Sequence, residues 1–403
     1  MINVAVLGYG TVGSGVVEVI EENKETVNKK SAAELNVKYI LDLRDFPGDP
    51  YENKVIHDFN IILNDPEVSI VCETMGGVGA AYKFTKECLL AGKSVCTSNK
   101  ELVAKHGPEL LQIAKDKQCN YLFEASVGGG IPVIRPINYS LTAEEIENIT
   151  GILNGTTNYM LTKMDALGAD FDEVLKEAQA NGYAEADPTA DIEGYDARRK
   201  IAILSSLMMT KNVDSEKVYT EGITKITSAD FEYAKAAGFK IKLLGTSEKV
   251  SDSEVAVMVA PFFIDLDHPL AMVNDVFNAV FVKGNMLGDS MYYGRGAGKL
   301  PTASAVVSDV IDCARHLGKT VMCFWDAEDV KLADVRELER EFFVRIDASA
   351  KDDLEELFED FEEIIADRKE DAGYFLPPTK EREVYEKLEK LGDKVLNVIR
   401  IYR

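Results

Sequence analysis

The 403-residue sequence has only four histidines and six cysteines, and neither residue type forms a metal-ligand pattern. No two cysteines are spaced as CxxC, and most lie in apolar runs, which is typical of buried free thiols in a reducing compartment. We therefore expect neither a disulfide scaffold nor a zinc module. The residues concerned are Cys72, Cys88, Cys96, Cys119, Cys313 and Cys323, with His57, His106, His268 and His316.

Long apolar runs are also missing, and the chain does not open with a charged segment followed by the apolar core of a signal peptide. No stretch approaches the roughly 18 apolar residues that a membrane-spanning helix needs. With 46% hydrophobic residues the chain can still bury substantial cores, and its length suggests two or three domains. We expect a globular, cytoplasmic protein without a membrane partner.

Basic residues are scarce relative to acidic ones, and the formal net charge is −24. Phosphate backbones select positively charged surfaces, so this balance argues against a nucleic-acid partner. Much of the charge is local, because residues 326–371 hold 19 acidic and 7 basic residues. We interpret this segment as a solvated helical surface.

The N-terminus carries a glycine pattern that indicates a dinucleotide site. An apolar run of strand type, residues 2–7, leads into Gly8-Tyr9-Gly10-Thr11-Val12-Gly13, and helical periodicity follows from Ser14. In such a turn Gly8 permits the tight bend, Gly10 lets the backbone approach a pyrophosphate, and Gly13 allows close packing of helix on strand. Gly8, Gly10, Thr11, Val12 and Gly13 are therefore candidate cofactor-binding residues.

Polar residues follow three further expected strands of the same sheet. A strand over 37–43 carries Asp42 and Arg44 at its end, where an acid suits the ribose hydroxyls of NAD and an arginine suits the 2′-phosphate of NADP. Strands over 68–73 and 93–97 lead to Thr74 and to Lys100. Open parallel sheets hold ligands at these strand ends, so both residues are candidates for cofactor binding. Lys100 is either a solvated charge or lies over the nicotinamide and the substrate. The choice between NADP and NAD stays open.

The segment from Tyr183 to Lys200 holds a candidate acid–base pair. Asp196 and Lys200 are four residues apart at the start of an apolar helical stretch, which places a carboxylate and an amine on one helix face. An amine held there beside a carboxylate is suited to proton transfer. A surface ion pair is the alternative interpretation of this segment taken alone.

Together these segments resemble homoserine dehydrogenase, an NAD(P)-dependent enzyme family that interconverts L-aspartate 4-semialdehyde and L-homoserine. The resemblance extends from Met1 to about Gly318 and rests on motifs in a fixed order. They are the glycine turn at 8–13, Ser94-Val-Cys-Thr-Ser-Asn-Lys100, Phe123-Glu-Ala-Ser-Val-Gly-Gly-Gly-Ile-Pro132, Asn154-Gly-Thr-Thr-Asn-Tyr159, the segment 183–200, Gly294-Arg-Gly-Ala-Gly298 and Pro301-Thr-Ala-Ser-Ala305.

The resemblance implies roles for individual residues. Lys200 would be the general acid that protonates the carbonyl oxygen as hydride arrives, and Asp196 would orient its amine. Glu185 would hold the ammonium group of the substrate, with Asp191 and Lys100 as further charged groups of the site. Such anchors suit a short zwitterionic substrate, whose few apolar atoms offer little binding energy.

A monovalent cation site is also implied by the resemblance. Glu124, Val127, Gly129 and Ile131 match the positions at which one carboxylate joins main-chain carbonyls, and hard oxygen ligands of this kind suit sodium. Without the resemblance, the three glycines at 128–130 would indicate a turn. The motif at 154–159 is equally compatible with a polar site and with turns and helix caps.

The expected fold is α/β, with an N-terminal Rossmann-type dinucleotide-binding domain, an α+β catalytic and dimerisation domain with a mixed sheet, and a small βα C-terminal ACT-like domain. The dinucleotide-binding domain would be discontinuous, residues 1–135 plus 300–320, and Gly296 would return the chain to the cofactor. The catalytic domain would span 136–299, with strands within 146–153, 240–246, 255–261 and 278–282. A homodimer or higher homo-oligomer is expected.

The C-terminal module, residues 335–403, is expected to contain a strand at 341–347, a helix at 354–365, a helix at 385–391 and a strand at 395–402. This order resembles a shortened ACT domain, a module that senses threonine in some relatives. The segment Asp347-Ala-Ser-Ala-Lys351 lacks the usual Pro-Gly of the ligand loop, and the middle strands are hard to recognise. A regulatory or assembly module follows, with threonine as a candidate effector.

Two other functions are compatible with parts of the sequence. Another NAD(P)-dependent reductase of an amino-acid semialdehyde or oxo acid would share the nucleotide domain, but Glu185 and the motif at 154–159 argue against it. A silent NAD(P)-binding sensor would have no need of the Asp196–Lys200 pair beside a nicotinamide.

Overall fold

The computed structural model describes all residues, 1–403, and its N-terminal part is built on a six-stranded sheet. The strand order is β3-β2-β1-β4-β5-β6, and every pair is parallel. This is the Rossmann order, which changes direction beside β1 and places ligands at the carboxyl ends of the strands there. The strands are β1 (Ile2–Leu7), β2 (Leu35–Leu41), β3 (Val55–Ile56), β4 (Val68–Glu73), β5 (Ser94–Thr97) and β6 (Tyr121–Leu122).

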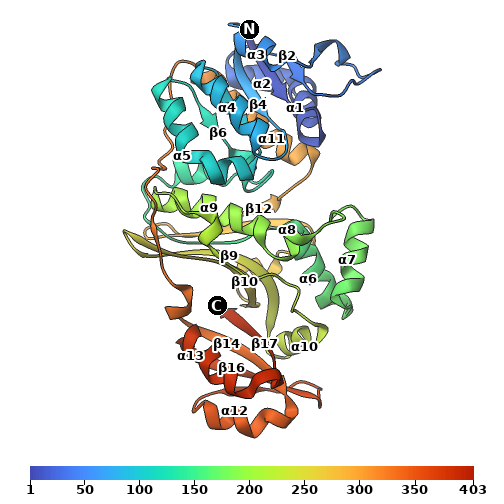
Figure 1. The fold of residues 1–403 in the computed structure, drawn as a ribbon, viewed down its shortest axis with the longest axis vertical. Coiled ribbons are helices and arrows are strands. Elements are labelled where there is room, and N and C mark those ends of the chain that lie inside the picture. Colours follow the sequence, from blue (N-terminus) through green and yellow to red (C-terminus); the bar gives the residue numbers. More distant parts are fainter.

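Helices cover this sheet, and one of them comes from far along the chain (Figure 1). α11 (Lys299–Arg315) packs against α1 (Thr11–Glu22), and both contribute apolar side chains to one core with β1 and β2. The segment expected at 300–320 therefore packs on the N-terminal unit as a helix. The other helices are α2 (Lys24–Ser31), α3 (Phe59–Asn64), α4 (Gly79–Leu90) and α5 (Lys100–Asp116). No helix of the chain is both long and apolar enough to cross a bilayer.

The second sheet is mixed and continues into the C-terminal module. Its order is β12-β11-β7-β9-β10-β17-β14-β16-β15, with β8 and β13 also paired to β10. Its first part comprises β7 (Ile146–Ile152), β8 (Tyr219–Thr220), β9 (Phe239–Ser251), β10 (Glu254–Asp265), β11 (Phe277–Gly284), β12 (Gly288–Arg295) and β13 (Lys331–Leu332). These strands include all four that the sequence predicted.

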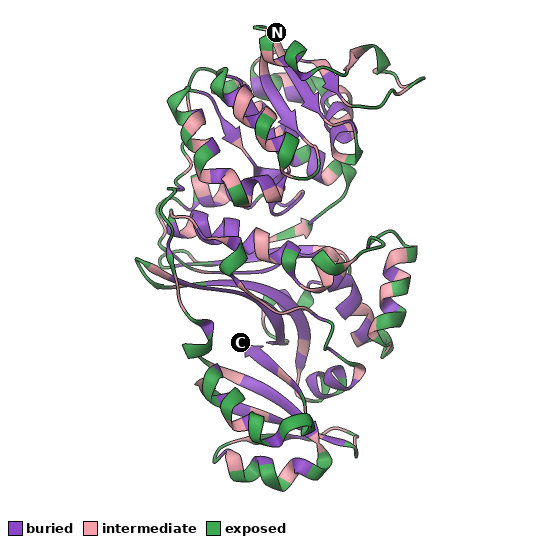
Figure 2. Ribbon diagram, viewed as in Figure 1, coloured by how far each residue is buried: buried purple, intermediate pink, exposed green.

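Helices of the middle segment lie on one face of this sheet and connect it to the N-terminal unit. They are α6 (Gly155–Leu167), α7 (Phe171–Ala180), α8 (Thr189–Ile192), α9 (Tyr195–Met209) and α10 (Ser228–Ala236). α9 lies between the two sheets and packs on α5, β9 and β10 (Figure 1). One apolar core therefore runs from the first sheet through α9 into the second, and buried residues form the interior of both (Figure 2).

The C-terminal module has the element order βαββαβ. It consists of β14 (Glu339–Asp347), α12 (Lys351–Leu357), β15 (Glu362–Ile364), β16 (Asp371–Lys380), α13 (Glu381–Leu388) and β17 (Val395–Tyr402). The expected helix at 354–365 was wrong in its second half, because Glu362–Ile364 pairs as an edge strand with β16. The expected helix at 385–391 begins and ends earlier, and the strand at 395–402 is confirmed.

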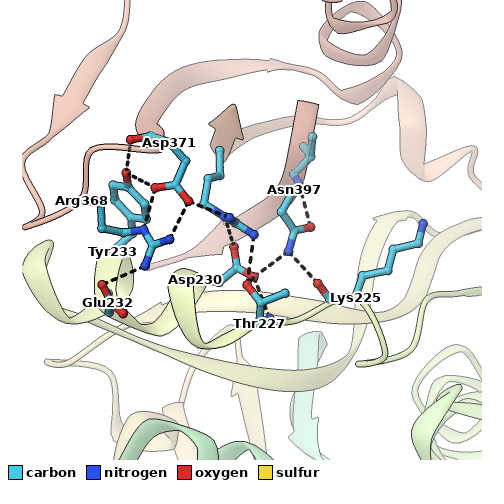
Figure 3. A network of polar contacts seen from close by, with 10 residues as sticks. Lys225, Thr227, Asp230, Glu232, Tyr233, Arg368, Asp371 and Asn397 are labelled. Atoms are coloured by element: carbon cyan, nitrogen blue, oxygen red, sulfur yellow. Dashed lines mark hydrogen bonds and ion pairs between the residues drawn. The ribbon is translucent and has the colours of Figure 1, made fainter. Parts of the chain in front are cut away.

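Buried ion pairs join this module to α10 (Figure 3). The guanidinium of Arg345 lies 2.9 Å from carboxylate oxygens of both Asp230 and Asp371, and it donates to the hydroxyl of Thr227. Asn397 donates its amide to Asp230, and Arg368 pairs with Asp371. Since β17 also pairs with β10, the module is bonded to the second sheet by backbone and side chains alike.

Candidate active site

The glycine turn at the N-terminus has the geometry that the sequence predicted. Gly8 has a φ of +89°, a conformation that favours glycine, and a Cβ on Gly13 would overlap the carbonyl oxygen of Gly8. A Cβ on Gly10 would meet open space, so the backbone is accessible there. Thr74 donates its hydroxyl to the carbonyls of Leu7 and Gly8 and thereby ties the end of β4 to the turn.

A cleft of about 560 Å³ opens at this turn and at the end of β2. Among the residues that line it are Gly8, Gly10, Asp42, Arg44 and Thr74. Asp42 accepts hydrogen bonds from the backbone N–H of Tyr9 at 2.8 Å and from the guanidinium of Arg44 at 3.0 Å. The hydrogen bonds from Arg44 hold the pKa of Asp42 well below its usual range, so the cleft carries a permanent carboxylate beside an exposed guanidinium.

A second cavity, of about 550 Å³, lies between the N-terminal unit and α9. Four separate parts of the chain supply most of its lining: the ends of the first sheet with residues 125–129, the start of α6, the segment 182–200, and the loop after β12. Most of the candidate catalytic residues meet there. The candidates that line the cavity are Val12, Lys100, Val127, Gly129, Glu185, Asp191, Asp196, Lys200 and Gly296.

Two lysines share one buried carboxylate in this cavity. The amine of Lys200 lies 2.8 Å from Asp196 Oδ2, and the amine of Lys100 lies 2.7 Å from Asp196 Oδ1. Asp196 is 5% exposed and Lys200 is 8% exposed. Burial opposes ionisation of Asp196, but the charges of the two lysines outweigh it and hold its pKa well below the usual range. Asp196 is therefore a fixed negative charge that orients both amines.

The amine of Lys200 also donates to the carbonyl oxygen of Leu153, at 2.7 Å. An ammonium group has three N–H donors, so these two contacts leave one free. Because Lys200 lines the cavity, that donor is available to a ligand oxygen. Burial lowers the pKa of Lys100, yet the charge of Asp196 outweighs burial and the net shift is upward. Lys100 is thus a permanent cation.

Asp191 and Glu185 differ in their surroundings. Asp191 accepts a hydrogen bond of 2.8 Å from the side-chain amide of Asn154, while burial and the nearby Asp196 raise its pKa. Glu185 is exposed at the cavity and forms no ion pair within the chain. A free carboxylate at the cavity mouth is suited to hold a cationic group of a ligand.

The predicted cation loop has a crowded backbone. A Cβ on Gly129 would overlap the carbonyl of Gly296, and a Cβ on Gly128 would lie 2.5 Å from the carbonyl oxygen of Ile131. These glycines are therefore required by close packing rather than by a flexible turn. No hydrogen bond reaches the main-chain oxygens of Val127, Gly129 and Ile131, although these residues are buried.

The side chain of Glu124 caps the helical segment that begins at Ile134. Its carboxylate oxygens accept from the backbone N–H groups of Val133, Ile134 and Arg135, at 2.6, 3.0 and 2.6 Å. Burial raises the pKa of Glu124, and these N–H groups oppose that shift. Neither Glu124 nor Ile131 lines the 550 Å³ cavity, and Thr11 and Gly13 line neither cavity.

Asn154 and Leu153 were not assigned a role from the sequence. The motif at 154–159 was compatible with a polar site and with a helix cap. Asn154 fits both interpretations, because it caps α6 and also contacts Asp191 and Asp196. Its position directly after a strand was the available signal. Leu153 contacts Lys200 through its backbone carbonyl. Every residue type has such a carbonyl, so this contact could not be predicted from the residue type.

Sequence profiles of two domains match the chain. The profile described as homoserine dehydrogenase, NAD binding domain, matches residues 8–124, and that of homoserine dehydrogenase matches residues 132–311. The homoserine dehydrogenase of Bacillus subtilis is 42% identical over 323 residues, covering 78% of this chain and 73% of the relative. That of a Synechocystis strain is 46% identical over 317 residues, covering 77% and 73%.

Solved structures agree with these matches. A homoserine dehydrogenase from Thiobacillus denitrificans superposes with a TM-score of 0.89 and 35% identity, covering 100% of this chain and 98% of that one. A Staphylococcus aureus homoserine dehydrogenase gives a TM-score of 0.82 at 33% identity, with the same coverage. A hyperthermophilic archaeal homoserine dehydrogenase in complex with NADPH gives 0.64 at 27% identity, covering 77% of this chain and 97% of that one.

Proposed function

The chain belongs to the homoserine dehydrogenase family, and from this premise we propose how its own residues carry the reaction. It is an oxidoreductase that interconverts L-aspartate 4-semialdehyde and L-homoserine with a nicotinamide nucleotide, a step of threonine, methionine and isoleucine biosynthesis. The bound cofactor supplies or accepts the hydride. The single observation that carries the assignment of roles is the buried carboxylate of Asp196 shared by Lys200 and Lys100.

Lys200 is the general acid and base. Two of its three N–H donors are used by Asp196 and Leu153, so the amine has a fixed position and one donor directed to the substrate oxygen. In the reductive direction that proton passes to the carbonyl oxygen as it becomes an alcohol. In the oxidative direction the amine of Lys200 takes the hydroxyl proton back.

Charged side chains around the cavity bind the zwitterionic substrate. Glu185, which has no ion pair of its own, receives the ammonium group, and Asp191 lies beside Lys200 as a second negative group. Lys100, held as a cation by Asp196, contributes the positive charge over the nicotinamide side. Charge-assisted hydrogen bonds of this kind supply binding energy that four carbon atoms do not.

The dinucleotide occupies the two cavities from Arg44 to Gly296. The free helix N–H groups after Gly10 suit the pyrophosphate, and the residues of the turn that take part are Gly8, Gly10, Thr11, Val12 and Gly13. Both NADP and NAD fit the ribose end, because Asp42 suits hydroxyls and Arg44 suits a phosphate. Arg44 is 63% exposed and free to turn from Asp42 toward a 2′-phosphate, which favours NADP.

Sodium is proposed at the loop of Glu124, Val127, Gly129 and Ile131. Val127, Gly129 and Ile131 are buried residues whose main-chain oxygens accept no hydrogen bond. With the carboxylate of Glu124 these oxygens would form a set of hard donors that suits a monovalent cation. Because Gly129 packs on Gly296, a cation bound there would fix the loop that borders the cofactor.

A homodimer or higher homo-oligomer is proposed from the open edge of the second sheet. β12 is the last strand at that end, and its neighbourhood exposes apolar side chains of Met286, Leu287, Met291 and Tyr293. An unpaired strand edge with apolar side chains is a template for a second copy. Light scattering on the purified protein tests this, and a monomer at micromolar concentration would refute it.

The boundaries proposed for the domains are 1–135 plus 300–320, 136–299 and 335–403. The last is proposed as an ACT-like regulatory or assembly module, since its βαββαβ order and its strand order β17-β14-β16-β15 are those of the ferredoxin-like arrangement. Threonine is the candidate effector. A threonine titration that changes neither the reaction rate nor the melting temperature would exclude threonine as the effector.

The function is tested by homoserine-dependent reduction of NADP and of NAD at alkaline pH. Each is measured in sodium chloride and in tetramethylammonium chloride of equal ionic strength. We expect turnover with both cofactors and a clear loss when sodium is replaced. No turnover in protein that binds the nicotinamide nucleotide would favour the semialdehyde or oxo-acid alternatives or the silent sensor.

A further inference from the structure

Asn154 occupies the junction where β7 ends and α6 begins, and its side-chain oxygen caps that helix. Oδ1 accepts from the backbone N–H of Thr157 at 2.8 Å and from its hydroxyl at 3.0 Å. A helix cap needs an acceptor, so these two bonds fix which end of the amide is oxygen. The Nδ2 group of Asn154 must then point away from α6, toward the cavity.

The Nδ2 group has two N–H donors, and each meets a different carboxylate. One reaches Asp191 Oδ1 at 2.8 Å and the other reaches Asp196 Oδ2 at 2.9 Å. Asp191 belongs to α8 and Asp196 to α9, so a single neutral side chain at the start of α6 bridges two negative groups from two other helices. All four hydrogen-bonding positions of the amide are thereby used.

The preceding residue holds the other half of the acid–base pair. The carbonyl of Leu153 accepts from the amine of Lys200, which also contacts the same Oδ2 atom that Asn154 reaches. One short junction therefore sets the positions of the amine and of the carboxylate that orients it.

We propose that Asn154 is a positioning residue of the reaction, whose side-chain amide bridges Asp191 and Asp196 and fixes their positions so that Lys200 holds its orientation. This inference rests on the proposed function of Lys200. Helix capping alone would require only the oxygen of residue 154, whereas the positioning role requires its two N–H donors. The two roles are separable, because serine and aspartate cap helices about as well as asparagine.

The charged groups that face Asp191 fix the direction of the expected pH effect. They are Asp196 and Lys200 on α9 and Lys100 on α5. Burial and Asp196 raise the pKa of Asp191, while the hydrogen bond from Asn154 lowers it. Without that donor the carboxyl group of Asp191 should take up its proton at higher pH, so the acid limb of kcat/KM moves upward.

The experiment compares Asn154→Ser and Asn154→Asp with wild type. Asn154→Ser keeps the cap and loses the donors, so we expect kcat to fall about 10–100-fold, the KM for cofactor to change little, and the acid limb to shift upward. Asn154→Asp adds a third carboxylate, so its kcat should fall further at alkaline pH than that of Asn154→Ser. On acidification its kcat should recover partly, because the protonated carboxyl group can donate a hydrogen bond.

Asn397→Ser is the matched control. Asn397 is also buried and also donates its amide to a carboxylate, that of Asp230, but it lies in the network of Figure 3 and does not line the cavity. This variant should lose stability without any movement of the pH profile.

The outcomes separate the inference from the function. An active wild type with an unshifted pH profile in Asn154→Ser would overturn the role of Asn154 alone, even if its rate were lower. A wild type without homoserine turnover would overturn the proposed function and the inference together.

Discussion

Replacing Arg345 by methionine should destabilise the whole chain rather than only its C-terminal module. Arg345 is 7% exposed and contacts two carboxylates, of which Asp230 is fully buried. After the change Asp371 keeps Arg368, but Asp230 keeps only neutral donors such as Asn397. Removing one partner of a buried ion pair costs about 3–5 kcal/mol, and the lower value applies because one carboxylate stays paired. At about 2–4 °C per kcal/mol the melting temperature should fall by roughly 6–12 °C.

Thermal melts of Arg345→Met, of Asp230→Asn and of the double variant measure this coupling. In the Asp230→Asn background, Arg345→Met should lower the melting temperature clearly less than in wild type, because no unpaired charge is left at residue 230. The single tryptophan, Trp325, packs against Gly107 and Phe123 of the N-terminal unit, so its fluorescence reports the far end of the molecule. Because α9 and β10 join the parts, tryptophan fluorescence and circular dichroism should change at the same temperature.

The pH dependence of the same variant has a defined sign. Burial opposes ionisation of Asp371, but its bonds to Arg368 and Arg345 outweigh it and lower its pKa from 3.8. A carboxyl group whose pKa is lower in the folded state stabilises the fold at pH values above its unfolded-state pKa. This stabilisation is lost as the pH falls through its folded-state pKa. The difference in melting temperature between wild type and Arg345→Met should therefore become smaller below about pH 3.8. A fall in melting temperature under 2 °C at neutral pH, or an equal cost in both backgrounds, would refute the reasoning.

Two further changes test the cofactor side. Gly129→Ala places a Cβ on the carbonyl of Gly296 at a φ of +57°, so we expect loss of turnover together with loss of the response to sodium, and retention of both would exclude the proposed contact between the loops. Arg44→Ala removes the exposed guanidinium beside Asp42, so the KM for NADP should rise about 10-fold or more while that for NAD changes little. Equal changes for both cofactors in steady-state kinetics would contradict this assignment of Arg44.

Local patterns were sufficient for the features that depend on neighbouring residues. The turn at Gly8, Gly10 and Gly13 and the pair Asp196–Lys200 follow from spacing along one strand or helix, and both have the expected geometry. The contacts of Lys100 with Asp196 and of Leu153 with Lys200 join distant segments. Periodicity carries no information about such contacts. The position of Lys100 after a strand predicted that it lies near the cofactor, but not its contact with Asp196.

The C-terminal module shows where propensity misleads. Residues 354–365 were expected to form one helix, but Glu362–Ile364 pairs with the edge of β16, and this pairing prevails over local preference. β16 was missed because it contains Pro377 and Pro378, which are rare in strands. They lie opposite a shift in register between Arg340 and Phe342 of β14, where the regular ladder is interrupted.

The central claim is that Lys200 transfers the proton in the interconversion of homoserine and aspartate semialdehyde. The most direct measurement is kcat for homoserine oxidation by Lys200→Ala, with the cofactor Kd measured by nicotinamide fluorescence. The control is Lys211→Ala, at a half-buried lysine that does not line the cavity. We expect kcat to fall by about 10²–10⁴-fold with an unchanged cofactor Kd, and no effect in the control. Turnover of Lys200→Ala within a few-fold of wild type would contradict the account.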